Sequence, residues 1–311
     1  ASNVAVGAYA LDANTTGTVN VAVGTAALGA LTTASYNTAL GYAALTTNVT
    51  GAQNTAVGYS ALTAATGADN TAVGSQALSS VAAGTYNTAV GRSAGAAVTT
   101  GVQNTLIGGL AGDAITTGNY NLAIGHQALS ATTTANYNVA VGRSALFTNI
   151  LGSHSTAIGI SALETQNYAT ATAAYNVAVG HEAGLSVTTG IQNTFIGGLA
   201  GDANTTANNN TAVGKSSLSA TTTGGENTAV GTNALATNTT ASNNTAVGTN
   251  ALKVNTTGTS NVAVGALALD ANTTASNNTA VGYAAGTAIT TGTQNTLIGG
   301  LAGDALTDAD S

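Results

Sequence analysis

One five-residue motif, N-[T/V]-A-[V/I]-G with a few substitutions, recurs along almost the whole chain and limits what the chain can fold into. Its copies start at residues 3, 20, 37, 54, 70, 87, 104, 121, 138, 155, 176, 193, 210, 227, 244, 261, 278 and 295. Successive starting numbers differ by 17, except for one difference of 16 (54 to 70) and one of 21 (155 to 176). Such a unit is too short for a strand and a crossover helix, which together need about 30 residues. The motif's first residue is called repeat position 1 below, and each copy is one coil.

The residue types of the repeat favour short strands joined by tight corners. Asn, Thr, Val and Gly are poor helix formers, whereas Thr and Val suit strands and Gly and Asn suit turns. We therefore expect an all-β fold, a parallel β-solenoid (β-roll) of eighteen coils, each with two short strands and two corners. It should form a single repeat domain over residues 3–311, with irregular coils at 54–69 and 155–175. Stacked at about 4.8 Å per coil, the coils would make a rod on the order of 85 Å long.

Three repeat positions are predicted to build the core. Position 4 is always Val, Ile or Leu, so we expect it to point into the coil, and position 9 is Leu in twelve copies, beginning with Leu11. Position 1 is Asn in every copy from Asn3 onward except at Ser155, which predicts a ladder of stacked Asn side chains. Position 5 is Gly throughout, from Gly7 onward. The absence of Pro fits, because a strand paired on both sides needs its backbone N–H groups.

The outward face of the strand is predicted to be unusually small and apolar. If positions 2 and 4 face inward, the Ala of position 3 and the Gly of position 5 face outward. A sheet exposed to water normally carries polar residues on that face. Contact with identical chains, in a homotrimer or a bundled fibre, would explain the pattern; the alternative is a flat face left bare.

Six coils depart from the Leu rule at position 9, in three adjacent pairs. They carry Gly95 and Gly112, Gly184 and Gly201, and Gly286 and Gly303. The second coil of each pair has a large residue at position 3 where all other coils have Ala, namely Leu106, Phe195 or Leu297. Loss of volume at one position and gain at another predicts that positions 3 and 9 touch, within one chain or between chains. The coil at 155–175 differs otherwise, with four extra residues that could form a binding loop, a bend or a neutral insertion.

Composition and motifs argue against catalysis and nucleic-acid binding. Four Lys and Arg face eleven Asp and Glu, for a net charge of −7, so no basic surface for phosphates is expected. There is no Cys, none of the three His has metal-ligand spacing, and no apolar run is long enough to insert into a membrane. The segment G-G-L-A-G-D, which ends at Asp113, Asp202 and Asp304, matches half of a calcium-binding β-roll motif. A turn-capping role is expected for these Asp residues, with calcium as the alternative, and we expect no enzyme activity and no cofactor.

Two variable positions carry most of the aromatic and charged side chains. Position 6 holds Tyr42, Tyr59, Arg92, His126, Arg143, His181, Lys215 and Tyr283. Position 17 holds Tyr36, Tyr86, Tyr120, Tyr137 and Tyr175. Stacking would align each set into a ridge that could contact cell-surface glycans or neighbouring fibres; the alternative is that these residues are solvated surface.

The N-T-A-V-G repeats resemble the heads of trimeric autotransporter adhesins and, more closely, the shafts of bacteriophage tail fibres. The resemblance covers nearly all 311 residues, although the adhesin head repeat is shorter than the repeat of this chain. It implies a parallel β-roll, usually trimeric, that is extracellular on a virion tail fibre or a cell surface. The expected function is therefore a structural fibre that acts as a rigid spacer and attachment element. A glycan-binding adhesion module and an ice-binding solenoid with Thr ladders are the alternatives.

Overall fold

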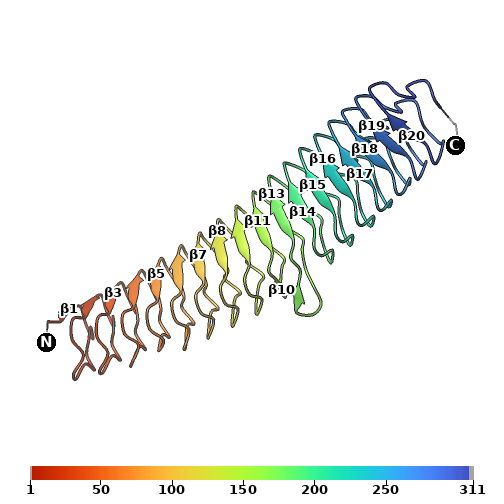
Figure 1. Ribbon diagram of the computed structural model, residues 1–311. Helices are drawn as coiled ribbons and strands as arrows, with labels where there is room; N and C mark the ends of the chain where they lie inside the picture. The colour runs from red at the N-terminus through yellow and green to blue at the C-terminus, as the bar shows by residue number, and fades with distance from the viewer. Residues whose placement is uncertain (1, 308–311) are drawn as a thin grey trace. The chain divides into compact units, whose positions relative to one another are not determined.

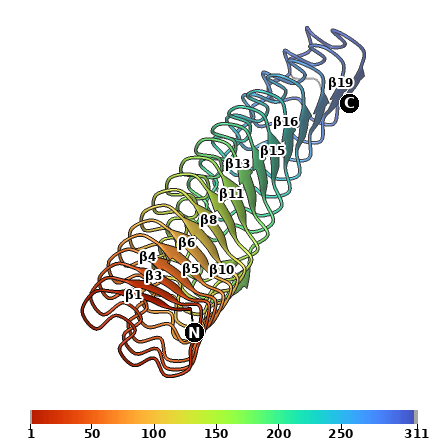
Figure 2. The same ribbon diagram turned by 90° about the vertical axis from the view of Figure 1, so that its left-hand side faces the viewer.

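The computed structural model describes residues 2–307, which contain strands and turns and no helix. The chain divides into two compact units. Unit 1 comprises Ala1–His154 and Tyr168–Ala173, and unit 2 comprises Ser155–Asn167 and Ala174–Ser311. Within each unit the backbone makes one coil per sequence repeat, and successive coils stack on one another (Figure 1, Figure 2). The predicted parallel β-solenoid, with one coil for each repeat, is thus confirmed.

Unit 1 contains a parallel sheet with one three-residue strand from each coil. The strands are β1 (Val4–Val6), β2 (Val21–Val23), β3 (Thr38–Leu40), β4 (Thr55–Val57), β5 (Thr71–Val73), β6 (Thr88–Val90), β7 (Thr105–Ile107), β8 (Leu122–Ile124) and β9 (Val139–Val141). They pair in repeat register, so that Ala22 lies opposite Ala5 and Ala39. The short strands β10 (Gly152–Ser153) and β12 (Thr172–Ala173) form a second parallel pair. The part of the long coil that contains β12 is therefore paired and does not form a free loop.

Unit 2 repeats the arrangement. Its main sheet consists of β11 (Thr156–Ile158), β13 (Val177–Val179), β14 (Thr194–Ile196), β15 (Thr211–Val213), β16 (Thr228–Val230), β17 (Thr245–Val247), β18 (Val262–Val264), β19 (Thr279–Val281) and β20 (Thr296–Ile298). Neighbouring strands are parallel and keep the repeat register, as in Ala212 opposite Phe195 and Ala229.

The two faces of these strands are the reverse of the prediction. Position 3 points into the coil: Ala22 and Ala39 are fully buried, whereas Leu40 at position 4 is 47% exposed. The reason is the width of the interior. The Leu of position 9 is also buried, as in Leu28 and Leu45, and fills the space in front of the strand. Only a methyl group fits opposite it, so the larger side chains of positions 2 and 4 lie outside.

The side of the coil opposite the strand contains turns, so the prediction of two strands per coil was wrong. Positions 7 and 9 adopt positive φ, for example 56° at Ala43 and 51° at Leu45. A strand cannot form where alternate residues are left-handed. The turns are nevertheless bonded from coil to coil: the Leu28 N–H donates to the Ala44 carbonyl at 3.0 Å. Each coil therefore has one strand of the main sheet and a hydrogen-bonded turn region, and the coils at 138–154 and 155–175 add the short strands β10 and β12.

The Gly of position 5 is required for two reasons, which Gly125 illustrates. Its φ is 130°, a conformation that residues with a Cβ rarely adopt. A Cβ placed there would also lie 2.6 Å from the carbonyl oxygen of Gly142 in the next coil. The strand can therefore turn into the corner only at Gly.

The Asn ladder is confirmed. The backbone N–H of Asn37 donates to Asn20 Oδ1 at 2.9 Å, and Asn20 Nδ2 donates to the Ala34 carbonyl at 3.0 Å. Asn3 does the same, accepting from the Asn20 N–H at 2.8 Å and donating to the Gly17 carbonyl at 2.8 Å. These amides thus join successive coils, and those of Asn3 and Asn20 also tie position 1 to position 15 across their own coils. Both polar ends are satisfied, which a buried amide requires.

The predicted contact between positions 3 and 9 is also confirmed, and it lies within one chain. Leu106 lies between Gly95 and Gly112: a Cβ on either Gly would be 2.7 Å from a methyl group of Leu106. Phe195 and Leu297 lie in the same way against the other pairs, Gly184 and Gly201 and Gly286 and Gly303. The enlarged position 3 occupies the space that two Leu side chains vacate.

Candidate functional surfaces

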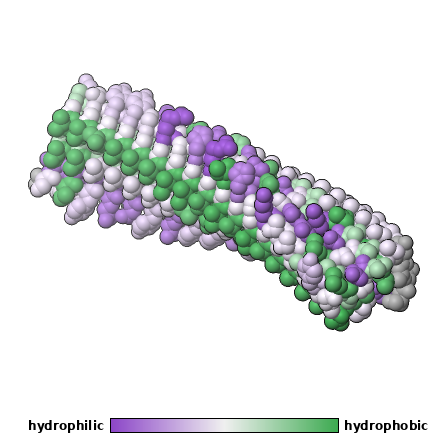
Figure 3. Space-filling view, turned by 90° about the horizontal axis from the view of Figure 1, so that it is seen from above, coloured by the Kyte–Doolittle hydropathy of each residue, from purple (hydrophilic) through white to green (hydrophobic). Residues whose placement is uncertain are grey.

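The largest candidate surface is the outward side of the strands, here called the strand face and defined as positions 2 and 4 of every coil. Its position-4 residues are apolar and are exposed or half-buried in both units, with Val90 38% and Ile196 40% exposed. A stripe of hydrophobic surface follows the stacked coils (Figure 3). Positions 2 and 4 hold only Thr, Val, Leu and Ile, so the strand face carries no charge.

One edge of the strand face is the position-6 ridge. The structure brings Tyr42 and Tyr59 together, with ring centroids 5.5 Å apart and planes at 9°. The side chains of Arg92, His126, Arg143, His181, Lys215 and Tyr283 are exposed on the same row of their units. His181 Nε2 lies 3.6 Å from an oxygen of its neighbour Glu182. The ridge therefore combines one aromatic pair with separate basic groups.

The other edge is the position-17 ridge, which contains a longer aromatic stack. The rings of Tyr120 and Tyr137 stack with centroids 4.9 Å apart and planes at 3°. The His154 ring continues the stack, with its centroid 5.1 Å from that of Tyr137 and the two planes at 29°. Tyr36, Tyr86 and Tyr175 are also exposed. Gln53 and Asp69 occupy position 17 between Tyr36 and Tyr86, which keeps those two rings apart. His154 was not predicted as part of this ridge, although its repeat position indicates it.

The three Asp residues of the G-G-L-A-G-D segments have different surroundings. Asp113 accepts a hydrogen bond from Ser130 Oγ at 2.7 Å. Burial raises the pKa of Asp202 above its ordinary value of 3.8, and nearby Glu182 acts in the same direction. Asp304 is exposed. Among residues 2–307 no three His, Cys, Asp or Glu side chains lie close enough to hold a metal ion. The geometry thus gives none of these Asp residues a carboxylate or imidazole cluster for calcium.

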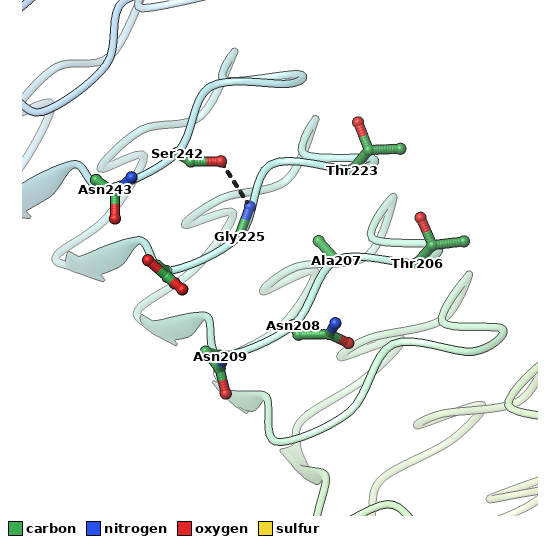
Figure 4. Close-up of a pocket in the computed structure, with 9 residues that line it drawn as sticks. Thr206, Ala207, Asn208, Asn209, Thr223, Gly225, Ser242 and Asn243 are labelled. Atoms are coloured by element: carbon green, nitrogen blue, oxygen red, sulfur yellow. Dashed lines mark hydrogen bonds between the residues drawn. The ribbon is translucent and has the colours of Figure 1, made fainter.

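A hollow of about 380 Å³ on unit 2 was not predicted. It lies over Gly225 and is bordered by Asn208, Asn209, Glu226, Ser242 and Asn243, which belong to three successive coils (Figure 4). The signal in the sequence is that Gly225 is the only Gly at position 16. Polar side chains on both sides of a missing one create the depression.

No protein-family model matches the chain, and no curated protein matches it significantly. In the described part of the chain, no helix is both long and apolar enough to cross a membrane.

Proposed function

We propose that this chain is a structural fibre element that assembles with identical chains through the strand face. The observation that carries the proposal is the outward row of Val, Ile or Leu at position 4 in every coil. A solitary soluble sheet would be expected to place polar residues on its solvent side. We therefore still expect identical chains to associate. The surface now proposed for the contact is the row of Val, Ile and Leu at position 4, rather than the Ala and Gly of positions 3 and 5.

The size of the strand face is sufficient for association. The position-4 side chains of nine coils, many of them more than a third exposed, present on the order of 500 Å² per unit, as large as the biggest patch on a typical monomer. A standard interface takes roughly 800 Å² from each partner, so the strand face of one unit would supply a large part of it. Removing this area from water supplies the driving force.

An identical chain is the partner that suits such a face best. The exposed rows repeat once per coil, and only a partner with the same coil spacing would keep its rows in step over nine coils. The face has no charges to direct a partner of opposite sign. Three chains around a common axis is the arrangement that the resemblance to adhesin heads and tail-fibre shafts implies.

As a fibre, the chain would serve as a rigid extracellular spacer on a phage tail or a cell surface. Two features support rigidity. The Asn ladder joins successive coils through side chains, and the turns join them through backbone hydrogen bonds. Repeat proteins of this kind are stabilised by each coil's contact with its neighbours. Such a chain offers length and stiffness rather than a catalytic cleft.

A charge-insertion experiment tests the proposal. Lys at position 4 of three adjacent coils (V90K, I107K and I124K together) should dissociate the assembly, because it buries like charges in the interface. The control places three Lys in the same coils at exposed position 14 (T100K, T117K and T134K). Light scattering after size-exclusion chromatography should show a smaller species for the first variant only. Equal masses for both variants and the unmodified chain would refute this interface.

The stacked rings of Tyr120, Tyr137 and His154 favour glycan recognition as a second function. Exposed aromatic rings present apolar faces and a polar edge, which suits sugar rings. The test is binding to a glycan array by the unmodified chain and by Y120A/Y137A. Y36A/Y86A, which removes two exposed but unstacked Tyr, is the control. Binding that only Y120A/Y137A loses supports this function, and an array without signal contradicts it.

A further inference from the structure

The hollow over Gly225 interrupts a hydrogen-bond pattern that several coils share at position 16. In this pattern the side chain of one coil accepts a hydrogen bond from the backbone N–H of position 16 in the preceding coil. The Ile191 N–H donates to Asn208 Oδ1 at 2.8 Å, and the Gly225 N–H donates to Ser242 Oγ at 3.1 Å (Figure 4). In unit 1 the Thr18 N–H likewise donates to Ser35 Oγ at 2.9 Å.

Gly225 has no side chain to continue this pattern, which changes the environment of Asn208. Among the described residues, no acceptor is hydrogen-bonded to the Asn208 backbone N–H. A Cβ on Gly225 would lie 3.7 Å from that nitrogen and 2.9 Å from the Asn208 carbonyl oxygen, so a side chain there requires a small shift of the backbone. The N–H therefore borders the same space that forms the hollow, and a ligand there could accept its hydrogen bond.

The other groups around the hollow are polar and of both hydrogen-bonding types. Glu226 contributes an exposed carboxylate, and Asn209 and Asn243 contribute exposed amides from the adjacent coils. The Ser242 hydroxyl, which already accepts from Gly225, retains its own proton for donation. The lining residues include no Lys, Arg, His or aromatic side chain. A bound anion would face Glu226 without a compensating positive charge, and one carboxylate is too few for a metal ion.

We propose that this hollow binds a neutral saccharide. A sugar hydroxyl can accept and donate hydrogen bonds at once, so one hydroxyl can accept from the Asn208 N–H while its neighbour donates to the Glu226 carboxylate. The volume of 380 Å³ falls in the range of about 300–1,000 Å³ that small-molecule sites have. Unlike the aromatic ridges, the site needs no stacked ring, and it requires neither the strand-face assembly nor binding at Tyr120 and Tyr137.

Saturation-transfer NMR with the unmodified chain tests the proposal, with glucose, mannose, galactose and N-acetylglucosamine as probes. G225S should restore the hydrogen-bond pattern, since Ser242 accepts such a bond at position 16 of the following coil. The Oγ of the introduced Ser side chain would accept a hydrogen bond from the Asn208 N–H and fill the hollow. E226Q should remove the charged acceptor. Each change should weaken binding of the preferred sugar about tenfold, the effect of losing one charge-assisted or buried hydrogen bond.

Two controls separate this site from the others. S276T alters position 16 in a coil outside the hollow and should leave affinity unchanged, as should Y120A/Y137A. Unchanged thermal unfolding of G225S and E226Q would show that the coils remain folded. In the amide spectrum, the Asn208 resonance should shift on sugar addition and should no longer respond in G225S. The proposal is overturned if no probe binds, if binding survives G225S and E226Q, or if it depends only on Tyr120 and Tyr137.

Discussion

Gln166 Oε1 accepts a hydrogen bond from Asn176 Nδ2 at 2.9 Å, at the one point where the Asn ladder of unit 2 has no Asn to precede it. Ser155 occupies position 1 of that coil, and its side chain carries no amide to continue the ladder. Gln166 Nε2 in turn donates to Ser155 Oγ at 3.0 Å. A longer side chain from position 12 thus replaces the missing amide, which explains why Ser155 occurs in a buried ladder.

Removing this replacement should destabilise unit 2. Q166A takes away an acceptor of the buried Asn176 amide and a hydrogen-bond partner of Ser155. We expect a loss of about 1–3 kcal/mol, the cost of removing buried hydrogen bonds. Urea unfolding followed by circular dichroism measures it, with Q103A, at an exposed position, as the control. A midpoint equal to that of the unmodified chain would show that Gln166 does not support the ladder.

The contact of Leu106 with Gly112 predicts a rescue. L106A should cost about 2–5 kcal/mol because it opens a cavity in the coil. G112L alone should also destabilise, because its Cβ would lie 2.7 Å from a methyl group of Leu106 and 2.8 Å from Ile115 Cδ1, at the flexible end of that side chain. L106A/G112L recreates the ordinary pairing of Ala and Leu and should be more stable than either single variant. A double-mutant cycle of urea unfolding gives the coupling, and strictly additive effects would contradict the contact.

Asn204 should be replaceable by an apolar residue with a gain in stability. It is 1% exposed, and neither its Oδ1 nor its Nδ2 has a hydrogen-bond partner in the described structure. Val187 occupies the same position in the preceding coil. N204V should therefore stabilise unit 2 by about 1–2 kcal/mol. The control is N238V, which should destabilise, because Asn238 Nδ2 donates to the Ala241 carbonyl at 3.0 Å. The expectation fails if both variants lose stability equally.

Asp202 makes the stability of unit 2 depend on pH. Burial raises its pKa above the ordinary value of 3.8, and its Oδ1 has no hydrogen-bond partner in the described structure. A carboxyl group of this kind favours folding while protonated and loses that contribution as the pH rises through its folded pKa. D202N should thus be more stable than the unmodified chain at neutral pH, by at most about 1 kcal/mol because the group is partly exposed.

Thermal unfolding as a function of pH measures this effect. The advantage of D202N should vanish below the ordinary pKa of 3.8, where the carboxyl is protonated in both states. D113N is the control, because Asp113 already has the Ser130 hydroxyl as a partner, and it should give no gain. A difference between D202N and the unmodified chain that is constant with pH would contradict this assignment.

The coil period, the Asn ladder and the contact of Leu106 with two Gly residues could all be predicted from the sequence. Each follows from residues that recur, or that change together, at fixed spacing. Which face of the strand points into the coil could not be predicted in this way. A strand of three residues alternates its faces, but alternation does not say whether Ala39 or Leu40 points inward. That depends on the interior width, which the Leu of position 9 determines from the far side of the coil.

The candidate sites were predictable to different extents. Stacking of Tyr120 on Tyr137 follows from equal repeat positions in adjacent coils. The hollow at Gly225 could not be predicted, because a Gly at a corner is usually explained by the backbone conformation that the corner requires. Its effect here depends on the Asn208 N–H and on the Ser242 hydroxyl, whose surroundings become visible only when the three coils are stacked.

Sedimentation equilibrium of the unmodified chain tests the central claim most directly. The strand face, with an outward Val, Ile or Leu in every coil, is proposed to be an interface between identical chains. We predict a stable multiple of the 29.6 kDa chain mass, three chains in the arrangement that the resemblance implies, with no monomer at micromolar concentration. A single species of 29.6 kDa across the whole concentration range would contradict the account.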